Sequence, residues 1–189
     1  MALFTMALSD REPGIRPHLT VGRRLDIVWR YVFPSMSGLA LMLLSVAPFG
    51  FWNQAALLPA VALICVWFWS LYRPVAMPPP IVLLLGLLLD LLGFLPLGVG
   101  GLTMLMTHGI AQLSRRFLSR QGFAMVWLFF AALSLGIAAI SWALVCLLTL
   151  TLFPFAPALF QAGLAVALYP TVAIPLALAH RGFADPERA

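Results

Sequence analysis

The chain contains no lysine and little charge of either sign, so it lacks the polar surface of an ordinary soluble protein. Only 9% of its 189 residues are charged and 63% are hydrophobic, and the mean hydropathy is +1.04. A typical soluble domain is about 25% charged and about 45–50% apolar. The polar side chains are too few to cover an apolar core, so the composition predicts that lipid surrounds much of the protein.

Several functional signatures are also missing from the sequence. There is no phosphate-binding glycine loop with lysine, no paired metal-ligand spacing and no serine elbow, so we expect no enzyme, cofactor or metal site. Cys65 and Cys146 each lie inside an apolar stretch, which is typical of small core residues and not of disulfides. The net charge of +5 does not indicate a nucleic-acid partner, because the arginines are spread between apolar runs.

What the sequence does contain is a series of apolar stretches separated by polar, proline-rich or glycine-rich joints. This pattern predicts an all-α integral membrane protein, a bundle of six transmembrane helices. The expected spans are residues 31–49, 56–72, 80–95, 98–114, 124–150 and 158–179. Residues 1–30 and 180–189 are expected to be cytoplasmic tails, and no cleaved signal peptide is evident. Two prolines, Pro170 and Pro175, are expected to kink the last span.

The positions of the arginines test this division independently. With six spans, the successive polar segments carry five, none, one, none, three, none and two arginines, so every arginine falls on one side. Arginine-rich segments stay in the cytoplasm, so both termini are expected there. The third and fourth spans are barely long enough for two crossings, and a re-entrant hairpin over residues 81–112 would leave the same pattern.

Asp90 is the only acidic residue inside an expected span, where an isolated carboxylate costs at least about 2.5–3.5 kcal/mol. Helix geometry places Thr103, Thr107 and His108 at comparable depths on the following helix. We expect Asp90 to be a buried hinge, either protonated or bonded to Thr103, Thr107 or backbone groups of the glycine turn. The alternatives are a proton or ligand site formed with His108, and a contact with a partner subunit.

Two other patterns concern the helix surfaces. The aromatic side chains between Trp67 and Tyr72 are expected to form a belt at the headgroup level and not a cofactor platform. Small residues at four-residue spacing, Ala132 with Gly136 and Gly163 with Ala167, permit close packing of helices.

The hairpin around Asp90 resembles the family of the rod shape-determining protein MreD. The matching residues are Gly86, Asp90, and the pair Leu97 and Gly98 at the following turn, before an apolar helix that ends in Arg115 and Arg116. A tryptophan-rich helix that opens with Pro59 and ends at Arg73-Pro74 is similar to the family's second span, and Leu168-Tyr169-Pro170 is similar to its last. The similarity covers about residues 59–181.

This resemblance implies a non-enzymatic scaffold subunit of the cell-elongation complex, located in the bacterial inner membrane. Such a subunit binds MreC, a periplasmic coiled-coil protein with a transmembrane helix, beside RodA and PBP2 and near cytoplasmic MreB filaments. The expected outer loops are short, so a partner would dock mainly inside the bilayer. We expect the hairpin of residues 81–112 to receive the partner helix, with Leu97 and Gly98 near its outer end.

The same resemblance leaves an alternative open. It also implies a fold similar to the six-helix substrate-binding subunits of vitamin-type transporters, so the chain is alternatively a small-molecule-binding membrane subunit. A carrier needs a pocket with several converging polar groups. The available groups are Asn53, Gln54, Asp90, Thr103, Thr107, His108, Gln112 and Gln161. This short supply favours the scaffold.

Overall fold

The computed structural model describes the backbone of residues 21–47 and 56–184, and the side chains of residues 32–47 and 56–178. Within these residues the fold is all-α and contains no strand, as the sequence predicts. The helices are α1 (Val21–Val46), α2 (Leu57–Tyr72), α3 (Pro79–Gly93), α4 (Val99–Leu118), α5 (Phe123–Thr149) and α6 (Ala156–Ala184). The short 3-10 helix η2 (Pro74–Ala76) follows α2.

The first and last helices are longer than the apolar stretches that predicted them. α1 begins at Val21 and not at Tyr31, and α6 continues to Ala184 and not only to Ala179. A helix bonds its own backbone groups, and arginine is a good helix former, so a helix continues past the end of an apolar run. The remaining parts of the expected tails, residues 1–20 and 185–189, lie outside the described residues.

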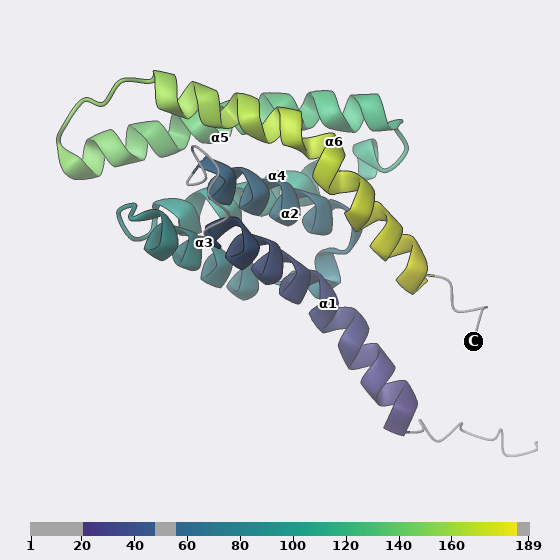
Figure 1. The fold of residues 1–189 in the computed structure, drawn as a ribbon. Helices are drawn as coiled ribbons and strands as arrows, with labels where there is room; N and C mark the ends of the chain where they lie inside the picture. Colours follow the sequence, from purple (N-terminus) through teal and green to yellow (C-terminus); the bar gives the residue numbers. More distant parts are fainter. Residues whose placement is uncertain (1–20, 48–55, 185–189) are drawn as a thin grey trace, which may run out of the picture.

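The helices form two hairpins around a central helix (Figure 1). α5 and α6 pack on each other and cover one side of α2 and α4. α3 and α4 form the second hairpin, and α1 lies against α2 and α3. The α3–α4 turn and the α5–α6 connection lie at the same end of the bundle, whereas α6 ends at the other end.

The central helix is α2, which contacts α1, α3, α4 and α6. Twelve of its 16 residues are buried, because a helix that is apolar on every side is stable only when other helices surround it. Trp67 stacks on Phe129 with ring centroids 5.7 Å apart, and Phe68 and Trp69 are also buried. The predicted aromatic belt is therefore wrong for these three side chains, and only Tyr72 of the group is exposed.

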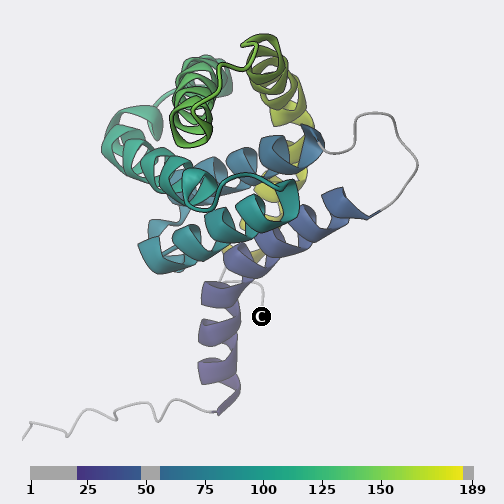
Figure 2. The ribbon, with the colours of Figure 1, turned by 90° about the vertical axis from the view of Figure 1, so that its left-hand side faces the viewer.

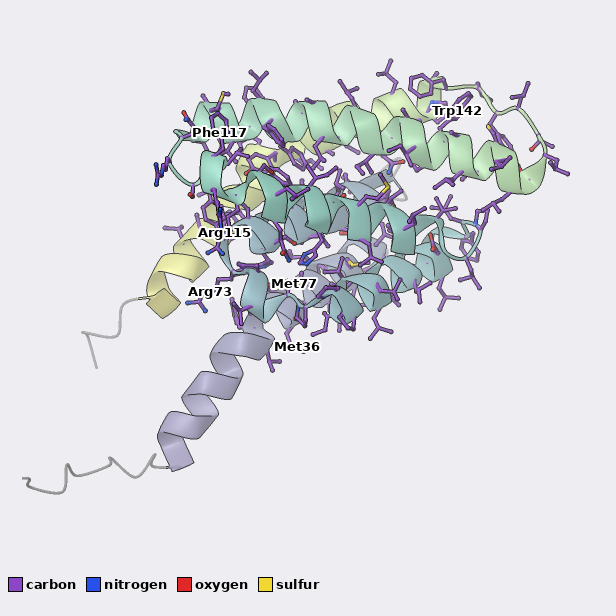
Figure 3. All side chains as sticks on the ribbon, turned by 180° about the vertical axis from the view of Figure 1, so that it is seen from behind. Met36, Arg73, Met77, Arg115, Phe117 and Trp142 are labelled. Atoms are coloured by element: carbon purple, nitrogen blue, oxygen red, sulfur yellow. The ribbon has the colours of Figure 1, made fainter. Side chains whose placement is uncertain are left out.

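The outer surface carries large apolar side chains on α1, α3, α4, α5 and α6. α5, with 27 residues, and the Ala156–Leu178 part of α6, with 23, are long and apolar enough to cross a membrane. Three apolar helical segments are shorter than these two: α2, α3 and the Val32–Val46 part of α1. Figure 3 shows Arg73 and Arg115 at one end of the bundle, and Trp142 toward the other.

Pro170 and Pro175 lie inside α6, which bends away from α5 in its second half (Figure 1). A proline has no N–H for the carbonyl four residues earlier, so Pro170 frees the carbonyl of Val166. The indole N–H of Trp127 on α5 donates to that carbonyl at 3.0 Å. The expected kink in α6 is thus accompanied by a replacement donor from α5.

α1 also contains a proline, Pro34, and its first part runs away from the other helices (Figure 2).

The backbones of α3 and α4 approach closely at Gly86. A Cβ atom on Gly86 would lie 2.6 Å from the carbonyl oxygen of Gly100 and 2.6 Å from the Cα of Gly101. Neither Gly136 nor Gly163 has an atom within 4 Å of such a Cβ, so the small-residue pairs on α5 and α6 are not sites of close approach. The α3–α4 hairpin depends on glycine at position 86.

We predict that Gly86→Ala destabilises the protein, because the added methyl group meets backbone atoms that cannot rotate away. Overpacking of this kind costs about 1–3 kcal/mol. Gly109→Ala is the matched control, since a Cβ atom at Gly109 on α4 meets nothing within 4 Å, and alanine in a helix gains about 0.5–1 kcal/mol over glycine. Unfolding of the purified variants in mild detergent measures both changes. Equal stability of the two variants would contradict the close contact.

Candidate functional site: the α3–α4 hairpin

The hairpin is organised by Asp90, whose side chain is completely buried near the end of α3. Its Oδ2 accepts a hydrogen bond from the N–H of Gly98 at 2.8 Å, and its Oδ1 accepts one from the N–H of Gly100 at 2.6 Å. The first N–H groups of a helix lack partners within the helix and form its positive end. Asp90 therefore caps the N-terminus of α4 from the neighbouring helix.

The backbone of the turn satisfies most of its own donors. The N–H groups of Phe94 and Leu95 both donate to the carbonyl oxygen of Asp90, at 3.0 Å for Leu95. The N–H of Val99 donates to the carbonyl of Pro96 at 3.3 Å. With the two bonds to the Asp90 carboxylate, five backbone donors of this turn have partners inside the hairpin. The turn needs no water molecule to satisfy them.

The turn presents apolar side chains outward. Phe94 is 96% exposed and Leu97 is 73% exposed. Phe94 also has a left-handed backbone with φ of 53°, a conformation that costs about 1–2 kcal/mol for a residue other than glycine. Gly98 has φ of +103°, which glycine adopts readily. The strained left-handed position is thus occupied by an exposed phenylalanine, although a glycine, Gly93, stands directly before it.

Thr103 and Thr107 do not pair with Asp90. The Thr103 hydroxyl donates to the carbonyls of Val99 and Gly100 at 2.9 and 3.1 Å. The Thr107 hydroxyl donates to the carbonyl of Thr103 at 2.8 Å. Threonine in a helix commonly bonds the carbonyl one turn earlier. Asp90 was expected to bond to Thr103, to Thr107 or to backbone groups of the glycine turn. In the structure it bonds to the backbone groups.

His108 belongs to a separate buried set of hydrogen bonds. Its Nδ1 lies 2.7 Å from the Ser70 hydroxyl on α2, and its Nε2 lies 2.6 Å from the amide nitrogen of Gln112. A neutral imidazole has one donor and one acceptor. Because the Gln112 amide nitrogen is a donor, Nε2 accepts and the Nδ1–H donates to Ser70. No hydrogen bond in the described part of the chain joins His108 to Asp90.

The role of Ser70 was not predicted from the sequence. It is the only serine or threonine in α2, and that isolation among apolar residues was the available signal. A buried hydroxyl requires a hydrogen-bond partner, and His108 on α4 supplies it. The set of Ser70, His108 and Gln112 fixes α2 against α4, which places the second hairpin on the central helix.

A cavity of about 330 Å³ lies between α2, the α3–α4 hairpin, α5 and α6. Most of its lining is apolar, and the polar side chains in the lining include Thr103, Ser134, Ser141 and Gln161. Ser134 donates to the carbonyl of Ala162 at 3.1 Å, and Ser141 donates to the carbonyl of Ala138 at 3.0 Å.

Other candidate polar groups lie outside this cavity: Asp90, Thr107, His108 and Gln112. Asn53 and Gln54, also considered for a carrier, lie outside the described residues. The cavity therefore offers few of the converging polar groups that a carrier would use.

No cluster of three or more His, Cys, Asp or Glu side chains that could hold a metal ion occurs among residues that the structure describes. Comparison of the chain with family models, with curated proteins and with solved structures gives no match. The candidate site is thus defined by its geometry, a rigid turn that Asp90 closes from inside and that carries exposed Phe94 and Leu97.

We predict that Asp90→Asn and Asp90→Ala destabilise the protein in increasing order. The asparagine side chain keeps one oxygen acceptor, but its NH2 group is a donor and faces one of the two backbone N–H donors. Alanine removes both acceptors. A hydrogen bond to a charged group contributes about 1.5–3 kcal/mol. Thr107→Val is the control, because the Thr107 hydroxyl bonds only a carbonyl of its own helix. If denaturant unfolding shows that Asp90→Ala destabilises the protein no more than Thr107→Val, the capping role is refuted.

Proposed function

We propose that this protein is a multi-pass protein of the bacterial inner membrane and a non-enzymatic scaffold subunit of the cell-elongation complex. In this role it binds MreC and helps to organise peptidoglycan synthesis beside RodA, PBP2 and MreB. The observation that carries the proposal is the α3–α4 turn, which satisfies its own backbone and presents Phe94 and Leu97 outward. The similarity of Gly86, Asp90, Leu97 and Gly98 to the MreD pattern lies in this same element.

Membrane insertion is supported by the exposed apolar side chains on five helices and by the arginine distribution. α3 has 15 residues and is about 22 Å long at 1.5 Å per residue, less than the roughly 30 Å of a bilayer core. The α3–α4 turn would therefore lie below the outer surface. Irregular backbone at such depth must find its partners within the protein. The Asp90 carboxylate supplies two of them.

The lipid-facing side of α3 offers a surface for the transmembrane helix of MreC. An apolar groove of about 450 Å³ lies between α1, η2 and α3 and is lined by residues such as Met36, Val75, Leu84 and Leu88. α3 forms one wall of the groove and leads into the turn with Leu97. Helices in lipid associate through close packing, so a fixed hairpin is a suitable partner surface.

The cavity supports a second candidate function, a small-molecule-binding membrane subunit of the vitamin-transporter type. Its volume of about 330 Å³ is within the usual range for ligand pockets, roughly 300–1,000 Å³. Of the polar groups expected for a carrier, Thr103 and Gln161 line it. A metabolite that stays bound through purification would favour this candidate over the scaffold.

The proposed topology predicts that single cysteines near the arginines are protected in intact cells. In a background without Cys65 and Cys146, Ser119→Cys beside Arg120 should react with a membrane-impermeant thiol reagent only after lysis. Thr151→Cys in the α5–α6 connection should react before lysis. Both positions are exposed, so access to each compartment decides the result. Labelling of Ser119→Cys in intact cells would overturn the orientation.

The scaffold role predicts that depletion of the protein in its native cell turns rods into spheres and that MreC co-purifies in mild detergent. Photo-crosslinkers at Leu84 and Leu97 should capture MreC. Leu159 and Leu178, exposed on α6, are the control positions. Unchanged cell shape would contradict the role, and crosslinks confined to α5 or α6 would contradict the docking surface.

A further inference from the structure

The end of the bundle that carries the α3–α4 turn is stepped. α5 has 27 residues and α3 has 15, which correspond to about 40 Å and about 22 Å. Figures 1 and 3 both show the α5–α6 hairpin extending beyond the α3–α4 turn. We call the space under this overhang, including the 330 Å³ cavity, the outer notch.

The walls of the outer notch are apolar on both sides. The α3–α4 hairpin contributes Leu89, Leu95, Val99 and Met104. The α5–α6 hairpin contributes Ile137, Val145 and Phe153. A hydrocarbon chain is the ligand that matches such walls, because removing apolar surface from water lowers the free energy.

The turns that border the outer notch also have the character of a surface in contact with hydrocarbon. Leu150 and Leu152 in the α5–α6 connection are 88% and 90% exposed, like Phe94 in the α3–α4 turn. Phe94 and Leu150 both have left-handed backbones with φ of 53°. Turns that face water use glycine, asparagine or aspartate at such positions. At the α3–α4 turn, which lies below the outer surface in the proposed topology, Phe94 indicates that lipid surrounds the mouth of the notch. The longer α5–α6 hairpin carries Leu150 and Leu152 up to the membrane surface, where Thr151 between them reaches water.

Most polar groups of the notch are already bonded within the protein. The hydroxyls of Ser134 and Ser141 donate to backbone carbonyls, and the Trp142 indole donates to the carbonyl of Phe153 at 3.0 Å. The side-chain amide of Gln161 on α6 forms no hydrogen bond with any described residue, and it lines the cavity. One amide donor on an apolar wall suits a ligand with a long apolar body and a single carbonyl.

We propose that the outer notch binds one acyl chain of an outer-leaflet phospholipid, with the Gln161 amide donating to the ester carbonyl at the head of the chain. This inference rests on the membrane insertion in the proposed function, and it is independent of MreC. A polar metabolite would leave most of its donors and acceptors unpaired against these walls.

The test uses the full chain in nanodiscs that contain phosphatidylcholine with a diazirine in one acyl chain. After irradiation, mass spectrometry should find severalfold more label on Val145 and Gln161 than on Leu135 and Leu147, which are exposed on α5. Ala138→Phe fills the notch and should reduce the label on Val145 and Gln161 severalfold. Ala139→Phe, an exposed neighbour on the same helix, should leave it unchanged. If Ala138→Phe does not fold, Ser141→Phe, half-buried on the same wall, replaces it.

Any of several results would overturn the proposal. Equal labelling of the notch and the outward face of α5 would show only bulk lipid. Label that survives both filling substitutions would place the chain elsewhere. Rapid reaction of Ser141→Cys with a water-soluble thiol reagent in nanodiscs would show a water-filled cavity open to polar ligands. Label on Leu135 and Leu147 without label in the notch would leave membrane insertion intact, whereas absence of both would contradict insertion itself.

Discussion

The structure depends on a carboxylate on one helix that completes the hydrogen bonding of the next. Asp90 accepts from the N–H groups of Gly98 and Gly100. Gly98 has a left-handed backbone with φ of +103°, and a Cβ atom on Gly100 would meet the Asp90 carboxylate itself. The absence of a Cβ atom on Gly86 lets α3 approach α4 closely enough for these bonds. A buried acid without partners would be costly, and a helix end without a cap would also be costly. Each satisfies the other, so the hairpin is stable in apolar surroundings.

The helices and the buried, hydrogen-bonded state of Asp90 could be predicted from the sequence because both signals are strong. Long apolar runs separated by proline and glycine mark helices, and a single acid in such a run requires compensation. The partners of Asp90 were harder to predict. Residue counting gives the depth of a side chain but not the direction in which its helix faces. Thr103 and Thr107 lie at suitable depths, yet each hydroxyl bonds a carbonyl of its own helix.

The aromatic residues show a second limit of sequence patterns. Trp67 and Trp69 are typical of a membrane interface and equally typical of a core, and the difference depends on which helix is central. α2 is apolar around its whole circumference, so its sequence has no polar face to indicate solvent or headgroups. The small residues on α5 were misleading for a related reason, since a Cβ on Gly136 meets open space. Such spacing permits a contact without requiring one.

The position of Asp90 also has a consequence for biosynthesis. A ribosome completes α3 before it makes Gly98 and Gly100, so the newly made acid has no internal partner until α4 begins to emerge. For a chain threaded into lipid during translation, α3 alone carries the penalty of a lone carboxylate, at least about 2.5–3.5 kcal/mol. Arrival of the next segment removes it. In a chain inserted this way, the two helices would partition from the translocon as a pair.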